Sequence, residues 1–181
     1  MASLTGVSVG FLGLGDVGRP VLRRLIARGA DVYASSRSPA LRYKMARDAA
    51  HLYKTPGEVC AHIGNGVIFV MLSKEALIDA FMEGKDGVLA NIAPGTLIVD
   101  LGQTSDATTA KFARAVREKG AHWLAAPALG DEQAATEGRL AVAARGERAD
   151  FDRALPLLQE IAREIGYDGA IGDAAAAQGG R

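Results

Sequence analysis

The sequence has 181 residues, of which 49% are apolar and 23% are charged, and 21 Lys and Arg residues balance 21 Asp and Glu residues. This length supports one sizeable domain with a buried core and is short for two domains. The neutral charge balance argues against nucleic acid as the main partner, because binding to the phosphate backbone needs a basic surface.

The single cysteine, Cys60, excludes an internal disulfide and a zinc site built on cysteines. The three histidines are scattered and form no ligand pattern, so we expect no metal site. The apolar runs are too short to span a bilayer, and the first residues lack the pattern of a signal peptide. We therefore expect a cytoplasmic protein with no membrane partner.

Short apolar runs alternate with helical patterns along the chain, which favours an open, doubly wound α/β fold. Strands are predicted over Val7–Leu12, Asp31–Ser35, Val67–Leu72, Leu97–Leu101, His122–Ala125, Leu140–Ala144 and Gly169–Ile171. Apolar residues at helical spacing predict helices over Thr108–Lys119 and Asp150–Ile165, and Pro156 is expected to kink the second helix or begin a new segment. Several strand runs are continuously apolar, which is typical of parallel strands covered on both faces.

The first predicted strand leads directly into a glycine-rich turn, "GLGDVG", and then into a helix that ends at Gly29. Gly13 permits a tight turn, Gly15 lets a pyrophosphate approach the backbone, and Gly18 lets the helix pack against the strand. The helix N-terminus offers N–H groups to the phosphates. The pattern predicts a dinucleotide site formed by Gly13, Leu14, Gly15, Asp16, Val17 and Gly18. A turn that binds nothing is the alternative, which the strand and helix on either side disfavour.

The second predicted strand ends in "VYASSRSPA", without the acidic residue that usually binds the ribose 2′-OH of NAD. Ser36, Arg37 and Ser38 stand in that region. Hydroxyls and a guanidinium suit a 2′-phosphate, which arginine can bind through two parallel hydrogen bonds. We therefore predict NADP(H) as the cofactor, with NAD less favoured. In the alternative interpretation Arg37 is a solvated loop residue and Ser38-Pro39 only begins the next helix.

"GFLGLGDVGRPVLRRL" followed by "SSRSP" resembles the start of the β-hydroxyacid dehydrogenases, such as hydroxyisobutyrate dehydrogenase and the N-terminal part of phosphogluconate dehydrogenase. Imine reductases are more distant relatives. The similarity continues through "VIFVMLSKEALIDAF", "GTLIVDLGQTS" and "AAPALGDEQAATEGRLAVAARG" and covers residues 5–172. It implies a Rossmann-type, mainly parallel sheet flanked by helices in a single domain. It also implies that Met71, Leu72 and Ser73 line the cofactor and that Gln103 approaches the nicotinamide.

The positions that carry substrate chemistry in that family differ here. The family's Asp-x-Ser-Thr loop reads Asp100-Leu101-Gly102-Gln103, and its substrate-binding serine is Leu129. Counting from the predicted Gly-x-x-Gly at 169–172 places the family's catalytic lysine at Gln178, and no lysine follows Lys119. The resemblance therefore assigns no catalytic residue in this chain.

The resemblance divides the chain into an NAD(P)-binding domain, residues 1–172, and a tail, residues 173–181, where the family's interdomain helix would begin. We predict the NADP(H)-binding domain of an oxidoreductase acting on CH–OH substrates, which needs a helical domain from another segment or a partner chain. The alternatives are a non-catalytic dinucleotide-binding or regulatory protein and a self-sufficient reductase with unfamiliar residues. An uncovered strand edge near residues 169–177 predicts a homodimer or a docked partner.

Two charge clusters receive simpler interpretations. Asp131, Glu132 and Glu137 are assigned to the favourable interaction of acids with a helix N-terminus. Arg23, Arg24 and Arg28 are expected to form a solvated basic face on the first helix.

Overall fold

The computed structural model describes residues 3–48, 50–72 and 74–171. Its main sheet is six-stranded, entirely parallel, and has the order β3-β2-β1-β4-β5-β6. The strands are β1 Ser8–Leu12, β2 Asp31–Ser35, β3 His51–Tyr53, β4 Val67–Val70, β5 Leu97–Asp100 and β6 His122–Ala125. The order reverses between β1 and β4, which is the position where doubly wound sheets bind ligands. The predicted Rossmann-type fold is confirmed.

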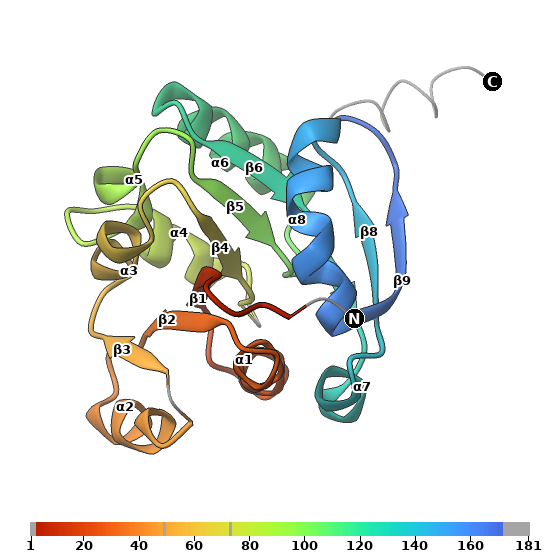
Figure 1. Ribbon diagram of the computed structural model, residues 1–181. Coiled ribbons are helices and arrows are strands. Elements are labelled where there is room, and N and C mark those ends of the chain that lie inside the picture. Colours follow the sequence, from red (N-terminus) through yellow and green to blue (C-terminus); the bar gives the residue numbers. More distant parts are fainter. Residues whose placement is uncertain (1–2, 49, 73, 172–181) are drawn as a thin grey trace.

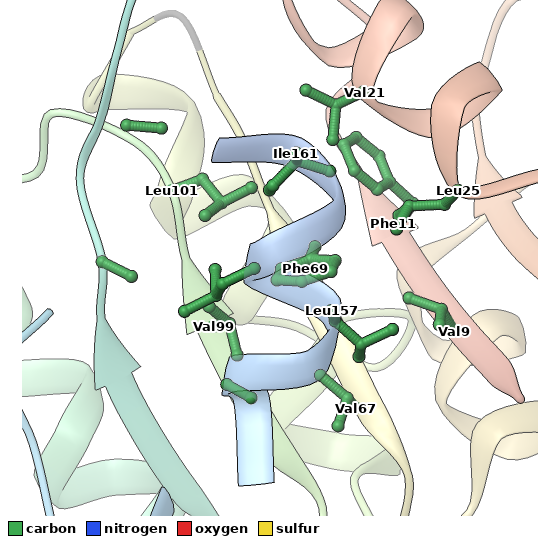
Figure 2. Packing of buried hydrophobic residues seen from close by; sticks show 14 of the residues in the cluster. Val9, Phe11, Val21, Leu25, Val67, Phe69, Val99, Leu101, Leu157 and Ile161 are labelled. Carbon is green, nitrogen blue, oxygen red and sulfur yellow. The ribbon is translucent and has the colours of Figure 1, made fainter. Parts of the chain in front are cut away.

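Helices cover both faces of this sheet (Figure 1). The helices of the described residues are α1 Gly18–Ala27, α2 Pro39–Ala46, α3 Pro56–Ile63, α4 Ala76–Met82, α5 Val88–Asn91, α6 Asp106–Glu118, α7 Glu132–Glu137 and α8 Arg148–Ile161, of which α7 packs against α1. One core cluster joins the sheet to α1 and α8, where Leu157 and Ile161 pack near Phe69 (Figure 2). A second cluster joins the opposite face to α3, α4 and α6. The sheet is thus buried on both sides, as continuously apolar strands require.

A second, three-stranded sheet follows, with the order β7-β8-β9, and α8 lies between it and β6 (Figure 1). Its strands are β7 Ala128–Leu129, β8 Leu140–Ala144 and β9 Ala162–Tyr167. Two predictions at this end are wrong: the helix expected to reach Ile165 ends at Ile161, and residues 169–171 form no strand. Parallel pairing of β9 with β8 replaces the last helical turns, because tertiary context overrides local periodicity in short segments. Pro156 lies within α8, which continues on both sides of it.

The expected solvated basic face on α1 is also wrong in part. The Arg28 guanidinium lies 2.7 Å from the carboxylate of Glu160 on α8, whose side chain is only 4% exposed. Arg24 donates to the backbone carbonyl of Glu160, whereas Arg23 pairs with Asp48 near the surface. A buried carboxylate is costly without a cationic partner, so these arginines stabilise the packing of α1 on α8.

Candidate functional site

The glycine loop joins β1 to α1 at the reversal point of the sheet. Gly13 has a φ of +118°, and a Cβ at this position would lie 1.9 Å from the Met71 carbonyl oxygen. A Cβ on Gly18 would lie 2.1 Å from the Gly13 carbonyl oxygen. Gly15 differs, because a Cβ there would meet no atom within 4 Å. The packing within the chain therefore requires glycine at 13 and 18, whereas the open space at Gly15 is room for a ligand close to the backbone.

The N-terminus of α1 lies beside this open space. Its N-cap residue is Val17, which provides no side-chain hydrogen bond, and its first turn holds no acidic residue. Asp16, just before the helix, forms an ion pair of 2.9 Å with Arg19. The first N–H groups of α1 are thus left without a side-chain cap, and the positive end of the helix dipole is available to an anion such as a phosphate.

A cavity of about 460 Å³ opens at the carboxyl ends of β1, β4 and β5. Its lining comes from four segments: Gly15, Asp16, Val17 and Gly18; Met71, Leu72, Glu75 and Ile78; Asp100, Leu101, Gly102, Gln103 and Thr104; and Ala128 and Gly130. It therefore brings together most of the residues predicted for the pyrophosphate and nicotinamide. Leu14 packs partly buried against the core instead, and Ser73 lies outside the described residues.

Two polar side chains on the β5–α6 segment shape the cavity wall. The Gln103 side-chain amide donates to the Ala128 carbonyl oxygen at 3.1 Å. Asp100 is 2% exposed, and its Oδ1 accepts a hydrogen bond of 2.9 Å from the Gly102 N–H. Burial raises the pKa of Asp100 to about 6, although hydrogen bonds from Thr104 and Gly102 act in the opposite direction. No role was predicted for Asp100, although an acid at the end of an apolar strand was a visible signal.

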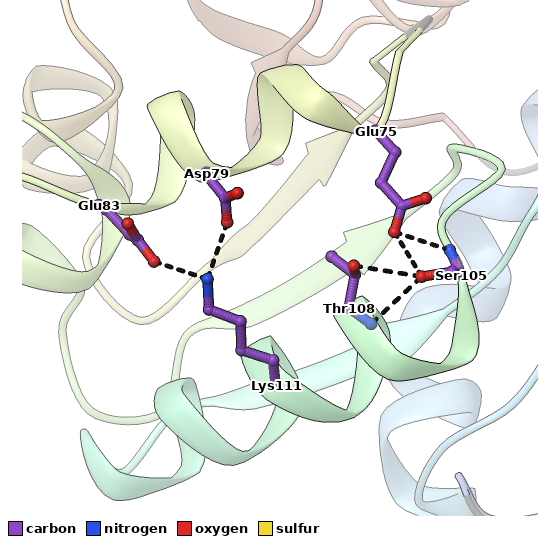
Figure 3. Close-up of polar contacts among 6 residues, drawn as sticks. All are labelled: Glu75, Asp79, Glu83, Ser105, Thr108 and Lys111. Atoms are coloured by element: carbon purple, nitrogen blue, oxygen red, sulfur yellow. Dashed lines mark hydrogen bonds and ion pairs between the residues drawn. The ribbon is translucent and has the colours of Figure 1, made fainter.

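Glu75 connects the two loops that line the cavity from β4 and β5 (Figure 3). Its Oε1 accepts from the Ser105 hydroxyl at 2.5 Å and from the Ser105 N–H at 3.2 Å. Hydrogen bonds from the Ser105 and Thr108 hydroxyls lower the pKa of Glu75. Further along the same helix pair, Lys111 contacts Asp79 and Glu83 at 2.8 and 2.7 Å. This network between α4 and α6 was not predicted, since it joins residues about 30 positions apart.

The segment expected to bind the 2′-phosphate lies outside this cavity. Ser38 caps α2, because its Oγ accepts from the Leu41 N–H at 3.2 Å, and the Ser36 Oγ accepts from the Ser38 N–H at 3.1 Å. The interpretation of Ser38-Pro39 as a helix start is therefore confirmed. Arg37 is exposed and lines a second pocket, of about 620 Å³. The Arg42 guanidinium, in the wall of the same pocket, donates to the Ser36 carbonyl oxygen at 2.5 Å.

The second pocket is predominantly basic. Its lining consists of Arg37, Pro39, Arg42, Lys54, Thr55, Pro56, Ala80, Glu83, Gly84, Lys85, Asp86 and Gly87. Four of these side chains are cationic and two are acidic, so the pocket favours an anionic group. Only Arg37 of the four cations was predicted, because the others come from α2, the β3–α3 connection and the segment after α4.

Other candidate residues take structural roles. Asp131 caps α7, with its Oδ1 2.8 Å from the Ala134 N–H, and Glu132 lies in the first turn, which confirms the helix N-terminus interpretation for these two residues. The interpretation is wrong for Glu137, which is the last residue of α7 and pairs with Arg139. Leu129 is 63% exposed and lies on β7. Burial raises the pKa of the Cys60 thiol to about 12, and His62 stacks on Tyr53. Among the described residues no three His, Cys, Asp or Glu side chains lie together as a metal site requires, and Gln178 lies outside these residues.

Comparison with known proteins agrees with the geometry of the glycine loop. Residues 8–169 match the family described as the NAD binding domain of 6-phosphogluconate dehydrogenase. The chain is 30% identical over 166 residues to 2-(hydroxymethyl)glutarate dehydrogenase of Eubacterium barkeri, a match that covers 92% of this chain and 54% of that protein. The chain thus spans about half the length of this curated relative.

Two solved structures share the fold. 3-Hydroxyisobutyrate dehydrogenase of Mycobacterium tuberculosis, solved with L-serine, is 26% identical with a TM-score of 0.83, over 95% of this chain and 57% of that one. Psf3 in complex with NADP+ and 2-OPP is 25% identical with a TM-score of 0.84, over 94% of this chain and 60% of that one.

The chain belongs to the family of NAD binding domains of 6-phosphogluconate dehydrogenase and its β-hydroxyacid dehydrogenase relatives. It is a nucleotide-cofactor-binding domain of an oxidoreductase family. Within the described residues, no helix is both long and apolar enough to cross a membrane.

Proposed function

We propose that this domain binds NADP(H) in preference to NAD(H). The observation that carries the proposal is the basic pocket, where Arg37 and Arg42 lie with Lys54 and Lys85 at the end of β2. The pocket takes the 2′-phosphate, with Arg37 as its direct ligand. The glycine loop fits the pyrophosphate, because Gly15 leaves its backbone open beside an uncapped helix N-terminus. When bound, the nicotinamide supplies the hydride chemistry, and the protein supplies position and electrostatics.

Calorimetry with NADPH and NADH tests the proposal. Hydrogen bonds to charged groups contribute about 1.5–3 kcal/mol, so Arg37→Ala should weaken NADPH binding by roughly ten- to hundredfold and leave NADH unchanged. Arg47→Ala is the matched control. Arg47 directly follows α2, the helix that begins two residues after Arg37, and lies near Tyr43, outside the pocket lining. Equal affinities of the parent chain for the two cofactors would contradict the proposal.

We further propose that residues 1–172 form the cofactor domain of an oxidoreductase whose substrate is covered by another segment or a partner chain. The greater length of the relatives supports this interpretation. A non-catalytic dinucleotide-binding protein is the second candidate, supported by Gln178 at the position where the family resemblance places the catalytic lysine. The two are distinguished by NADPH consumption with the chain alone and with any captured partner present.

We also propose a cytoplasmic location and self-association or partner docking at the second sheet. Within the described residues β9 pairs on one edge only, with β8, and the exposed Leu129 lies on the same sheet. Light scattering at high protein concentration measures the assembly. A monomer that captures no partner would contradict this proposal without affecting the cofactor proposal.

A further inference from the structure

Glu75 is one of three acidic residues in the described lining of the main cavity. The other two are Asp16 and Asp100, and no described Lys, Arg or His residue joins them in that lining. Asp16 forms its ion pair with Arg19, and its side chain is 85% exposed. Asp100 corresponds to the aspartate of the family's Asp-x-Ser-Thr loop. Glu75 is therefore the acid in this cavity wall whose charge is still without an assigned role.

Hydrogen bonds, and not an ion pair, hold the Glu75 carboxylate at this wall (Figure 3). Its Oε1 accepts from the hydroxyl and from the N–H of Ser105. Ser105 is the N-cap of α6, so the positive end of that helix also favours a carboxylate here. The hydroxyls of Ser105 and Thr108 lower the pKa of Glu75, which is therefore ionised at pH 8. No Lys, Arg or His side chain among the described residues forms an ion pair with Glu75, so its charge is not neutralised.

The same cavity is where the nicotinamide end of the cofactor is expected. Gly15 of the glycine loop and Gln103, which the family resemblance places near the nicotinamide, line it together with Glu75. The oxidised nicotinamide ring carries a positive charge that the reduced ring lacks, because reduction adds a hydride, which is one proton and two electrons. The pyrophosphate and the 2′-phosphate are the same in both forms. A carboxylate in this wall therefore attracts the oxidised ring and contributes little to binding of the reduced one.

We propose that Glu75 makes this domain discriminate between the redox states of its cofactor, by favouring NADP+ over NADPH. The inference rests on the proposed cofactor function. It concerns the redox state of the bound nucleotide and assigns no substrate. Glu75 acts through its charge at the cavity wall, where Ser105 holds the carboxylate in position.

The expected size of this effect follows from the exposure of Glu75. Its side chain is exposed, so solvent screens its charge and the discrimination is moderate. We expect the charge of Glu75 to change the ratio of the two dissociation constants by about two- to fivefold in favour of NADP+. Tighter binding of the oxidised form lowers the reduction potential of the bound couple, and a threefold change in the ratio corresponds to about 14 mV for two electrons. The bound couple then donates hydride more readily.

Glu75→Gln tests the proposal, because it removes the charge and keeps an acceptor oxygen for Ser105. Calorimetry with the intact chain at pH 8 gives the dissociation constants of NADP+, NADPH and adenosine 2′,5′-bisphosphate, which lacks the nicotinamide. We expect the variant to bind NADP+ about two- to fivefold more weakly relative to NADPH, and the bisphosphate as the parent does. An unchanged ratio of NADP+ to NADPH affinity would overturn the proposal, even if all three ligands bound more weakly. A shift of the ratio toward NADP+ would overturn it as well.

Two further variants separate the charge of Glu75 from other effects. Glu75→Asp keeps the charge on a shorter side chain, so its ratio should stay closer to that of the parent than the ratio of Glu75→Gln does. Asp79→Asn removes a charge from α4 outside the cavity lining, where Asp79 pairs with Lys111, and should leave the ratio unchanged. A shift in either variant as large as that in Glu75→Gln would contradict the proposal. If the parent chain binds neither NADP+ nor NADPH, the proposed cofactor function fails as well. If it binds both with a ratio that does not depend on Glu75, only this inference fails.

Discussion

The two pockets at the carboxyl edge of the main sheet have opposite charge. The pocket beside β2 and β3 has four basic and two acidic side chains in its lining, whereas the charged side chains described in the lining of the cavity at β1, β4 and β5 are Asp16, Glu75 and Asp100, all of them acidic. In the proposed complex with NADP+, the 2′-phosphate would place negative charge in the basic pocket, and the oxidised nicotinamide ring would place positive charge in the acidic cavity. The charges of the two pockets would then favour the same direction of the cofactor as the glycine loop does.

The largest effect should come from the glycine loop between β1 and α1, whose later residues, Gly15–Gly18, line the acidic cavity. Gly13→Ala places a Cβ against the Met71 carbonyl at a φ of +118°, so we expect a loss of more than about 4 kcal/mol in the free energy of unfolding, or no folded protein. Chemical denaturation measures this loss. Gly15→Ala is the matched variant, because its Cβ meets nothing within 4 Å.

Gly15→Ala should keep the parent's stability and weaken NADPH binding by roughly tenfold or more, because the added methyl group occupies the space left for the pyrophosphate. Calorimetry provides the affinity. If Gly15→Ala unfolds like Gly13→Ala, or binds NADPH as the parent does, the division between structural and ligand-contacting glycines is wrong.

The buried carboxyl group of Asp100, in the acidic cavity, should lower the free energy of unfolding in a pH-dependent way. The pKa of Asp100 is about 6 in the folded chain against an ordinary value of 3.8, so the folded state binds more protons than the unfolded state between these pH values. The stability that Asp100 contributes is therefore present below pH 4 and lost as the pH rises to 6. Asp100→Asn should be more stable than the parent by about 1–3 kcal/mol at pH 8 and equal to it at pH 4. Urea unfolding at both pH values measures the difference, and a constant difference would contradict the assignment.

Replacing Arg42, the second arginine of the basic pocket, should weaken NADPH binding. Arg42 contacts the Ser36 carbonyl and lines the same pocket as Arg37, so Arg42→Met should weaken NADPH binding by roughly three- to tenfold and change NADH binding little. Arg47→Met is the control, because Arg47 directly follows α2, the helix that carries Arg42. Equal losses for both cofactors would show that Arg42 maintains the loop and does not discriminate the 2′-phosphate.

The smallest effect is expected at the outer part of the α4–α6 contact. Lys111 is 52% exposed and pairs with two carboxylates that are about as exposed. Because solvent screens such pairs, Lys111→Met should cost less than about 1 kcal/mol and leave NADPH affinity unchanged. Thermal unfolding and calorimetry check both values. A large loss of affinity would mean that the whole helix pair, and not Glu75 alone, positions the cavity loops.

Local sequence determined the elements and the phosphate-binding turn. Strands 31–35, 122–125 and 140–144 have the predicted bounds, because continuous apolar runs between turns leave few alternatives. Gly13, Gly15 and Gly18 were predicted with separate roles, since the motif needs glycine for reasons that lie within a few residues of the loop.

The strand pairing in the second sheet and the charge of the two pockets depend on the tertiary structure. Residues 162–165 continue a helical pattern in the sequence but pair with β8, because partner strands are chosen across long separations. Lys54 and Lys85 reach Arg37 from other loops, and Glu75 reaches Ser105 across 30 positions. Periodicity in the sequence indicates which face of a helix or strand is buried. The electrostatic potential of a pocket depends instead on which charged side chains, far apart in the sequence, come together in the folded chain.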